Sequence, residues 1–452
     1  MKQRFYTFLL TTFVLSGWSL VMPGLTGHLA GAQEKPWTLQ ECIGYALDHN
    51  LTVQQGALQV QQREIDLNTA RSSRLPGVAG SASQNFSFGR GLTENNTYAN
   101  TNTTNTSFSV GADMTLFNGL RTYNNILLGK LNLEAATADL EKAKDNIRVA
   151  VAQAYVQILY NREIAEVAAR QVEIDSLQVM RLEALLANGK STAADVAAQK
   201  ASLAQGRLTA VQAENNLQLA RLDLAQLLEL PSPEGFDVAL PSDDALALPL
   251  PAGSEIIYEE AVGIKPSVRA EETRLASAAR NIDLARGGYL PSLSLSGGLG
   301  TNYYTSSGYA GKSFFDQLSN NFSQYVGLSL NVPIFSRLST RNQVRSARVS
   351  YEAQQLQLET VKKQLFKEIQ QAWYNALSAR TKFESSTQAA SAAAESFALA
   401  TAKYENGKSS ITEFNEAKNQ YLKARSDLAQ ARYEYLYQTR LLDFYRGREL
   451  TL

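Results

Sequence analysis

Asn188-Gly189-Lys190-Ser191 is repeated 218 residues later as Asn406-Gly407-Lys408-Ser409. The same shift relates further residues without a gap: Phe117 and Phe335, Tyr155 and Trp373, Arg207 and Arg425, and Leu224 and Leu442. Upstream, a shift of 215 aligns Leu75-Pro76 with Leu290-Pro291. A repeat of this length predicts an internal duplication in which both halves have the same layout.

Each repeated turn joins two predicted helices. The helix before it, residues 120–187 or 338–405, has no proline and carries apolar and small residues three and four apart, as in a coiled coil. At 1.5 Å per residue such a helix spans roughly 100 Å, so it must pack along other helices. Gly189 and Gly407 suit the left-handed position at a helix C-terminus.

The return helices begin at two predicted capping boxes and end near residues 228 and 446. Thr192 with Asp195, and Ser410 with Glu413, have the spacing of an N-cap and its N3 acid. Each half therefore contains a long helical hairpin.

Upstream of each hairpin, the apolar residues change from helical spacing to strict alternation with small polar residues. This pattern predicts four strands, at about 78–89, 106–117, 292–303 and 322–333. Strands of this length can cross a bilayer when tilted. The alternation is also typical of a half-buried antiparallel sheet on a soluble domain.

The predicted domain order is a signal peptide, a first repeat, a linker and a second repeat. Residues 1–32 have Lys2 and Arg4 before an apolar run and small residues at a cleavage site. The first repeat covers 33–230 and the second 254–452, and the proline-rich linker 231–253 joins them. No later stretch is apolar enough for a membrane-spanning helix.

Composition excludes several functions. Lys+Arg and Asp+Glu are equal at 43 each, which argues against nucleic acid as a partner. Cys42 is the only cysteine and His49 the only histidine after the signal peptide, so disulfides, zinc sites and histidine-based catalysis are not expected. We find no catalytic constellation, and we expect neither an enzyme nor a cofactor.

Four strands cannot enclose a channel, and open sheet edges in lipid would leave backbone groups without partners. Oligomerisation removes these edges, and three chains would supply twelve strands. The layout of strand, strand, long helix, turn and shorter helix, present twice with Leu-Pro before each strand pair, resembles the TolC-type outer membrane efflux proteins. The resemblance covers essentially the whole mature chain; it is diffuse in identity but specific in layout.

The resemblance implies a mainly helical, mixed membrane protein. It would be a homotrimer with a twelve-stranded β-barrel in the outer membrane of a Gram-negative bacterium, continued by a long periplasmic α-helical barrel, with the linker contributing to an equatorial collar. Its function would be a passive exit duct for efflux or secretion, and its partners would be outer membrane lipid, a periplasmic adaptor and an inner membrane pump.

In that family, the turns at the periplasmic tip carry a glycine-centred motif that meets the adaptor. The matching positions are Asn188, Gly189, Lys190 and Ser191, and Asn406, Gly407, Lys408 and Ser409. Turn chemistry alone also explains both glycines.

The family narrows its closed tip with acidic residues, which Asp195, Glu413 and Glu416 match here. Helix capping is the alternative role of Asp195 and Glu413. Some members hold the tip shut with an arginine after the glycine; Ser409 stands at that position here.

Two other classes of protein share some of these features. A secreted or surface coiled-coil structural or adhesive protein would also have a signal peptide and long heptads, but it would not need strand pairs at the same points of both halves. A periplasmic adaptor has one helical hairpin between soluble β-domains and does not repeat the whole layout.

Overall fold

The computed structural model describes residues 35–92, 97–241, 252–307 and 311–451. Contacts divide the chain into two units, residues 1–35 and 36–452, and every described residue except Lys35 belongs to the second unit. The predicted signal peptide and residues 242–251 of the predicted linker lie outside the described residues.

The two halves share four helices and two strands in the same order, as expected for an internal duplication. The elements of the first half are α1 (Leu39–His49), α2 (Leu51–Ser72), β1 (Gly77–Leu92), β2 (Tyr98–Asn118), α3 (Arg121–Ala187) and α4 (Ala193–Leu227). Those of the second half are α5 (Ser254–Val262), α6 (Pro266–Arg286), β3 (Ser292–Ser306), β4 (Ser323–Asn331), α8 (Ser339–Glu405) and α9 (Ile411–Tyr445), with η2 (Gly287–Tyr289) before β3 and α7 (Phe314–Asn320) before β4.

Local chemistry sets the helix starts. The Thr38 side chain accepts from the Glu41 backbone at 3.3 Å, and the Glu41 carboxylate accepts from the Thr38 backbone at 2.7 Å, so α1 begins with a capping box. Asn50 is the N-cap of α2, and its side chain accepts from the Thr52 backbone without a capping box.

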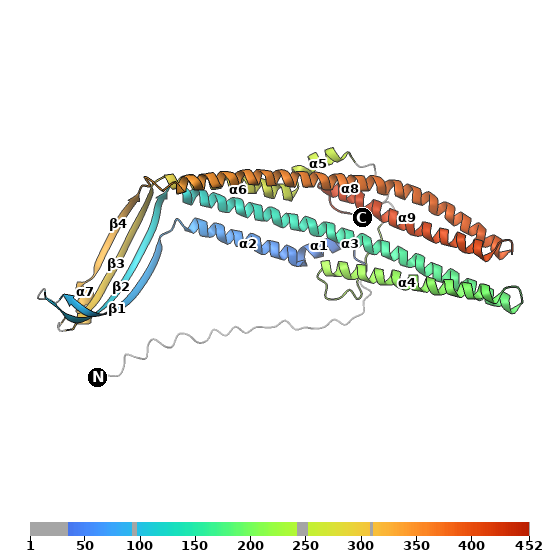
Figure 1. The fold of residues 1–452 in the computed structure, drawn as a ribbon, viewed down its shortest axis with the longest axis horizontal. Helices are drawn as coiled ribbons and strands as arrows, with labels where there is room; N and C mark the ends of the chain where they lie inside the picture. The colour runs from blue at the N-terminus through green and yellow to red at the C-terminus, as the bar shows by residue number, and fades with distance from the viewer. Residues whose placement is uncertain (1–34, 93–96, 242–251, 308–310, 452) are drawn as a thin grey trace, which may run out of the picture. The chain divides into compact units, whose positions relative to one another are not determined.

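The four strands form one antiparallel sheet in the order β1-β2-β3-β4 (Figure 1). β2 begins at Tyr98, eight residues before its predicted start, and the Asn- and Thr-rich segment between the two predicted strands pairs with the end of β1. Hydrogen bonds between strands join backbone N–H and C=O groups and do not require apolar side chains. A search for hydrophobic alternation therefore does not reveal this part of the strand. β4 ends at Asn331, short of the predicted residue 333, where Pro333 has no N–H to donate.

One further difference is a bulge in β2. The pairing skips from Thr115 to Phe117, so Leu116 is the extra residue and Phe117 lies opposite Leu293. The strand predicted at 106–117 was expected to alternate without such an interruption.

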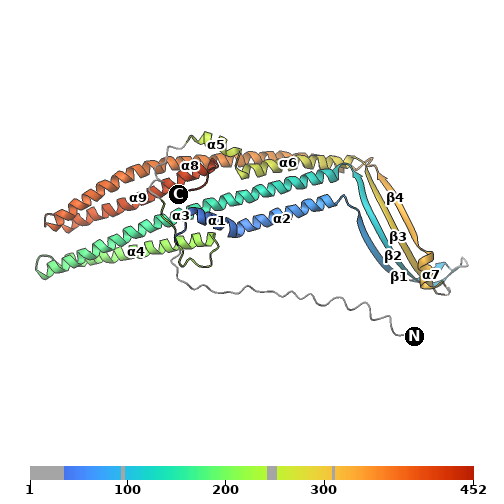
Figure 2. The same cartoon turned by 180° about the vertical axis from the view of Figure 1, so that it is seen from behind.

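The helices lie side by side in rows. Contacts join α2 to α3, α3 to α6 and α6 to α8 near the sheet, and α4 to α3, α3 to α9 and α9 to α8 towards the turns (Figure 2). Because α3 and α8 each run from a strand to a turn, the sheet and the turns stand at opposite ends of this unit (Figure 1). The main core lies between these ends, where α1, α3, α4 and α9 contribute buried residues.

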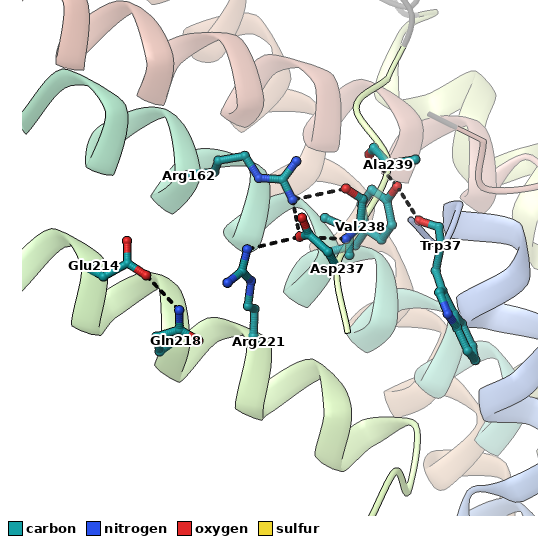
Figure 3. A network of polar contacts seen from close by, with 9 residues as sticks. Trp37, Arg162, Glu214, Gln218, Arg221, Asp237, Val238 and Ala239 are labelled. Carbon is teal, nitrogen blue, oxygen red and sulfur yellow. Dashed lines mark hydrogen bonds and ion pairs between the residues drawn. The ribbon is translucent and has the colours of Figure 1, made fainter. Parts of the chain in front are cut away.

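The start of the predicted linker is fastened to the first hairpin and to the segment before α1 (Figure 3). Trp37 and Val238 form a parallel bridge, and the Tyr155 hydroxyl lies 2.7 Å from the Ala239 carbonyl oxygen. Arg162 of α3 and Arg221 of α4 both pair with the Asp237 carboxylate. One carboxylate therefore connects the linker to both helices of the hairpin.

Candidate functional site: the sheet face and the hairpin turns

One face of the sheet is apolar and exposed. Strand pairing sets Val110 opposite Leu299, Leu295 opposite Leu328 and Leu293 opposite Leu330, and directly paired side chains project to the same side. This register places nine large, exposed apolar side chains on the same face: Val78, Phe86, Phe88, Phe108, Val110, Leu299, Val326, Leu328 and Leu330. An exposed apolar surface of this continuity indicates contact with lipid or another protein.

The opposite face carries mainly small polar side chains, together with the exposed Tyr325. The Ser81 and Ser109 hydroxyl oxygens are 2.7 Å apart, and so are those of Ser83 and Ser107. The sheet thus separates an apolar side from a polar side, as a wall between lipid and water requires. Among the described helices, none is both long and apolar enough to cross a membrane.

The two repeated turns have the same geometry. Gly189 has φ +67° and Gly407 has φ +70°. In the first turn, the backbone N–H of Lys190 donates to the Leu185 carbonyl oxygen at 2.8 Å, and the backbone N–H of Gly189 donates to the Leu186 carbonyl oxygen at 2.9 Å. These two hydrogen bonds form a Schellman motif. In the second, Lys408 donates to Lys403 and Gly407 to Tyr404 in the same pattern.

Most residues of these turns are exposed. Asn188, Lys190, Asn406 and Lys408 are exposed, and nothing lies within 4 Å of a Cβ built on either glycine. The Ser409 hydroxyl differs, because it is buried without a hydrogen-bond partner. The turns therefore offer open backbone at the end of the hairpins.

The predicted acidic residues have different surroundings. The Asp195 carboxylate accepts from the Thr192 hydroxyl at 2.7 Å, the Thr192 backbone at 3.2 Å and the Ser191 hydroxyl at 3.4 Å. The hydrogen bonds from Thr192 hold the pKa of Asp195 below its usual range. Glu413 and Glu416 are exposed, and the Ser410 hydroxyl accepts from the Glu413 backbone at 3.2 Å. At Ser410 only this half of the predicted capping box is seen among the described contacts.

The two turns are brought together by Arg181 of α3. Its guanidinium lies 4.9 Å from the centre of the Tyr404 ring and donates to the Glu405 carbonyl oxygen at 3.1 Å. Tyr404 in turn stacks on Phe414 of α9. Sequence reasoning did not identify this contact.

Sequence reasoning also missed a buried polar layer that joins the hairpins about two to three helical turns from their ends. It pairs Asp175 of α3 with Lys418 of α9. A signal was present, since Lys418 stands four residues after Phe414 and four before Leu422, both buried, on one apolar stripe of α9.

No group of three or more His, Cys, Asp or Glu side chains in the described part of the chain is placed to hold a metal ion. The described residues form a sheet with one apolar and one polar face, and two long helical hairpins. Both are elements from which the wall of a channel can be built.

Both halves match the family described as outer membrane efflux protein, over residues 42–229 and 257–448. Outer membrane efflux protein BepC of Brucella suis is 24% identical over 377 residues, which cover 82% of this chain and 74% of BepC. Cation efflux system protein CusC of Escherichia coli is 25% identical over 450 residues, covering 92% of this chain and 89% of CusC. The structure of the outer membrane channel MtrE of Neisseria gonorrhoeae is similar with a TM-score of 0.72 at 21% identity, over 91% of this chain and 88% of MtrE.

The match confirms the predicted family resemblance, the fold class, the outer membrane location and the role in efflux. A secreted coiled-coil structural protein does not account for a family match over both halves. The chain belongs to the outer membrane efflux protein family, and it is an outer membrane efflux channel.

Proposed function

We propose that three copies of the chain form a passive exit duct, which receives substrates from an inner membrane pump through a periplasmic adaptor. The observation that carries the proposal is the four-stranded sheet with one exposed apolar face, in which β1 and β4 are the outer strands. Unpaired strand edges in lipid cost several kcal/mol for each unsatisfied group. Pairing β1 of one copy with β4 of the next removes the edges, and three copies give a twelve-stranded barrel.

The outer helices of each chain support the same arrangement. α2 and α8 are the two ends of the helix row near the sheet. On α2, Leu51, Leu58 and Ile65 are exposed at intervals of seven, and on α8 Val349 and Leu356 are exposed at the same interval. Apolar residues seven apart form the seam of a coiled coil. We infer that α2 of one copy packs on α8 of the next.

Light scattering of the detergent-extracted protein tests this assembly. We expect the wild-type mass to be that of three copies. Leu58→Asp places a charge in the proposed seam and should yield monomers, whereas Gln59→Asp, at an exposed polar position of the same helix outside the seam, should remain trimeric. A wild-type monomer, or a Leu58→Asp trimer as stable as Gln59→Asp, would contradict the proposed seam.

The exposed turns are the proposed docking site for the adaptor. Their open backbone beside Gly189 and Gly407 allows close approach of another chain. Asn tolerates a positive φ, so Gly189→Asn and Gly407→Asn should keep both turns while adding a side chain that blocks the approach. We expect this double variant to lose co-purification of the adaptor from the native cell envelope.

Ala201→Asn is the matched control, since it adds the same side chain at an exposed position of α4 away from the turn. The trimer mass of each variant shows that assembly is intact. Undiminished adaptor binding by the double variant would exclude the turns as the docking site.

For the gate, we propose that Glu413 and Glu416 carry the charge and that Asp195 mainly caps α4. Glu413 and Glu416 are exposed and three residues apart on one helix face, so three copies would present stacked acidic rings. Planar bilayer recordings should show reduced cation selectivity for Glu413→Gln/Glu416→Gln and unchanged selectivity for Asp195→Asn. The reverse result would assign the gate to Asp195, and absence of any conductance in all three proteins would reject the pore.

A further inference from the structure

A cavity of about 690 Å³ lies between the two halves of the fold, away from the sheet and the turns. Its walls come from α1, α3, the turn between α5 and α6 with the first residue of α6, the end of α9 and the C-terminal segment after α9. This volume is in the range of small-ligand sites. Neither α2, α4 nor α8, which form the ends of the helix rows, contributes to its walls, so the proposed trimer seam leaves it uncovered.

The cavity wall contains an incompletely satisfied buried cation. The Lys265 side chain is 9% exposed, and its Nζ lies 3.7 Å from the centre of the Phe444 ring. Its one hydrogen bond is to Asp145 at a long 3.4 Å, although an ammonium has three donors. Burial lowers the pKa of Lys265, and the nearby Asp145 opposes this change.

Asp145 is shared, so it does not neutralise Lys265 alone. The Arg148 guanidinium binds the same carboxylate at 2.8 Å. Over the whole wall, four cationic side chains face two carboxylates: Arg148, Lys265, Arg446 and Arg448 against Asp145 and the exposed Glu449. Arg446 and Arg448 have their own partners in Glu260 and Asp443, so the excess positive charge lies at Lys265 and Arg148, which share the Asp145 carboxylate.

The cavity wall also has apolar side chains, and hydrogen bonds fix the C-terminal segment that forms part of it. Phe444, Ile264 and Leu450 provide apolar surface beside Lys265. The Gln40 side chain donates to the Leu450 carbonyl oxygen at 3.0 Å, and Arg446 binds Glu260 through two hydrogen bonds, which fix the C-terminal segment against α1 and α5. A cationic group beside an apolar wall suits an anion with an apolar body.

We propose that this cavity binds a carboxylate attached to a small apolar group, with the carboxylate on Lys265 and Arg148 and the apolar group against Phe444. A free aromatic acid and the C-terminal carboxylate of a partner peptide share this chemistry. The site is independent of the duct and of its docking turns.

The test uses the full-length protein in detergent and ¹⁹F NMR titration with two carboxylate probes. One is 4-fluorophenylacetate, and the other is N-acetyl-alanyl-4-fluorophenylalanine. We expect saturable binding of at least one, and the tighter probe identifies the source as a free acid or a peptide terminus. The neutral 4-fluorophenylacetamide should bind at least about tenfold more weakly than the acid, because it forms no charge-assisted hydrogen bond.

Two variants locate the binding. Lys265→Met should weaken binding of the acids about tenfold or more, and Asp145 keeps Arg148 as its partner in that variant. Gly44→Phe should fill the cavity, since nothing lies within 4 Å of a Cβ at Gly44, which lines it. Lys130→Met, which removes an exposed lysine of α3, should bind as the wild type does.

Absence of saturable binding by both acids would overturn the proposal. So would equal binding of the amide, or unchanged affinity in both Lys265→Met and Gly44→Phe. Light scattering on the same samples reports the trimer, so a failed duct assembly is recognised separately from a failed site.

Discussion

Lys418 of α9 and Asp175 of α3 form an ion pair in which both side chains are buried, with 1% and 0% exposed. Gln199 of α4 donates to the same Asp175 oxygen at 3.0 Å, and Asn415 donates to Gln199 at 3.2 Å. The other Asp175 oxygen is buried without a hydrogen-bond partner. Three long helices are thereby joined across the two hairpins by one carboxylate.

Lys418→Met should strongly destabilise the protein. Removal of one partner leaves a buried charge without compensation, which costs about 3–5 kcal/mol. Asp175→Leu/Lys418→Met should recover most of the loss, because apolar residues of similar volume replace the whole pair. Guanidinium unfolding in detergent measures both changes in the free energy of unfolding.

The matched control is an exposed ion pair. Arg170 and Glu173 of α3 have side chains 62% and 56% exposed, so Arg170→Met should cost less than about 1 kcal/mol. If Lys418→Met costs no more than Arg170→Met, the buried pair does not stabilise the hairpins.

The sequence predicted the elements that depend on local pattern. Asn188-Gly189-Lys190-Ser191 and its copy mark both hairpin turns, because a glycine directly after a long helical pattern takes the left-handed conformation that ends the helix. The alternation around Val110 and Val326 likewise located the strands whose apolar residues share one face.

The remaining features depend on contacts distant in the sequence. The Tyr98 end of β2 is held by backbone pairing with β1 and has no apolar alternation. The position of Lys418 on the apolar stripe of α9 indicates burial, but its partner Asp175 lies 243 residues away and is identified only when the helices are packed. A local signal for α7 was present but overlooked, since the Ser313 side chain accepts from the Asp316 backbone in an S-x-x-D cap.

Gly119→Ala should be far more harmful than Gly189→Ala. Both glycines have positive φ, +68° and +67°, so in both variants the left-handed backbone conformation costs alanine roughly 1–2 kcal/mol. At Gly119 the new Cβ would overlap the Gly287 carbonyl oxygen, whereas at Gly189 it meets open space. The added clash must displace backbone at the start of the long helix. Thermal unfolding of both variants measures the two losses of stability. Equal losses would show that the backbone near Gly287 moves away from the new Cβ without an energetic cost.

The Cys42 thiol should not react in the folded protein. It is fully buried in α1, and burial raises the pKa of Cys42 to about 12, so the thiol stays neutral and shielded at pH 8. We expect a thiol-specific chromogenic disulfide to react only when the protein unfolds. Cys42→Ser/Ala187→Cys, with the thiol on an exposed residue at the end of α3, should react at once. Rapid reaction of Cys42 in the native trimer would contradict the packing of α1.

The cap between Thr192 and Asp195 should make the start of α4 sensitive to acid. Because the pKa of Asp195 is lowered in the fold, its contribution is complete above the ordinary carboxyl pKa of about 4 and is lost as pH falls through the lower folded value. Thr192→Val removes the 2.7 Å hydroxyl bond, so the pKa should return towards the ordinary value. Hydrogen exchange at the first turn of α4, corrected for the intrinsic rate at each pH, measures the transition. We expect the wild type to keep its protection to lower pH than Thr192→Val. Asp195→Asn, which cannot ionise, should show no transition in this range, and an identical acid transition in all three proteins would exclude Asp195 as its origin.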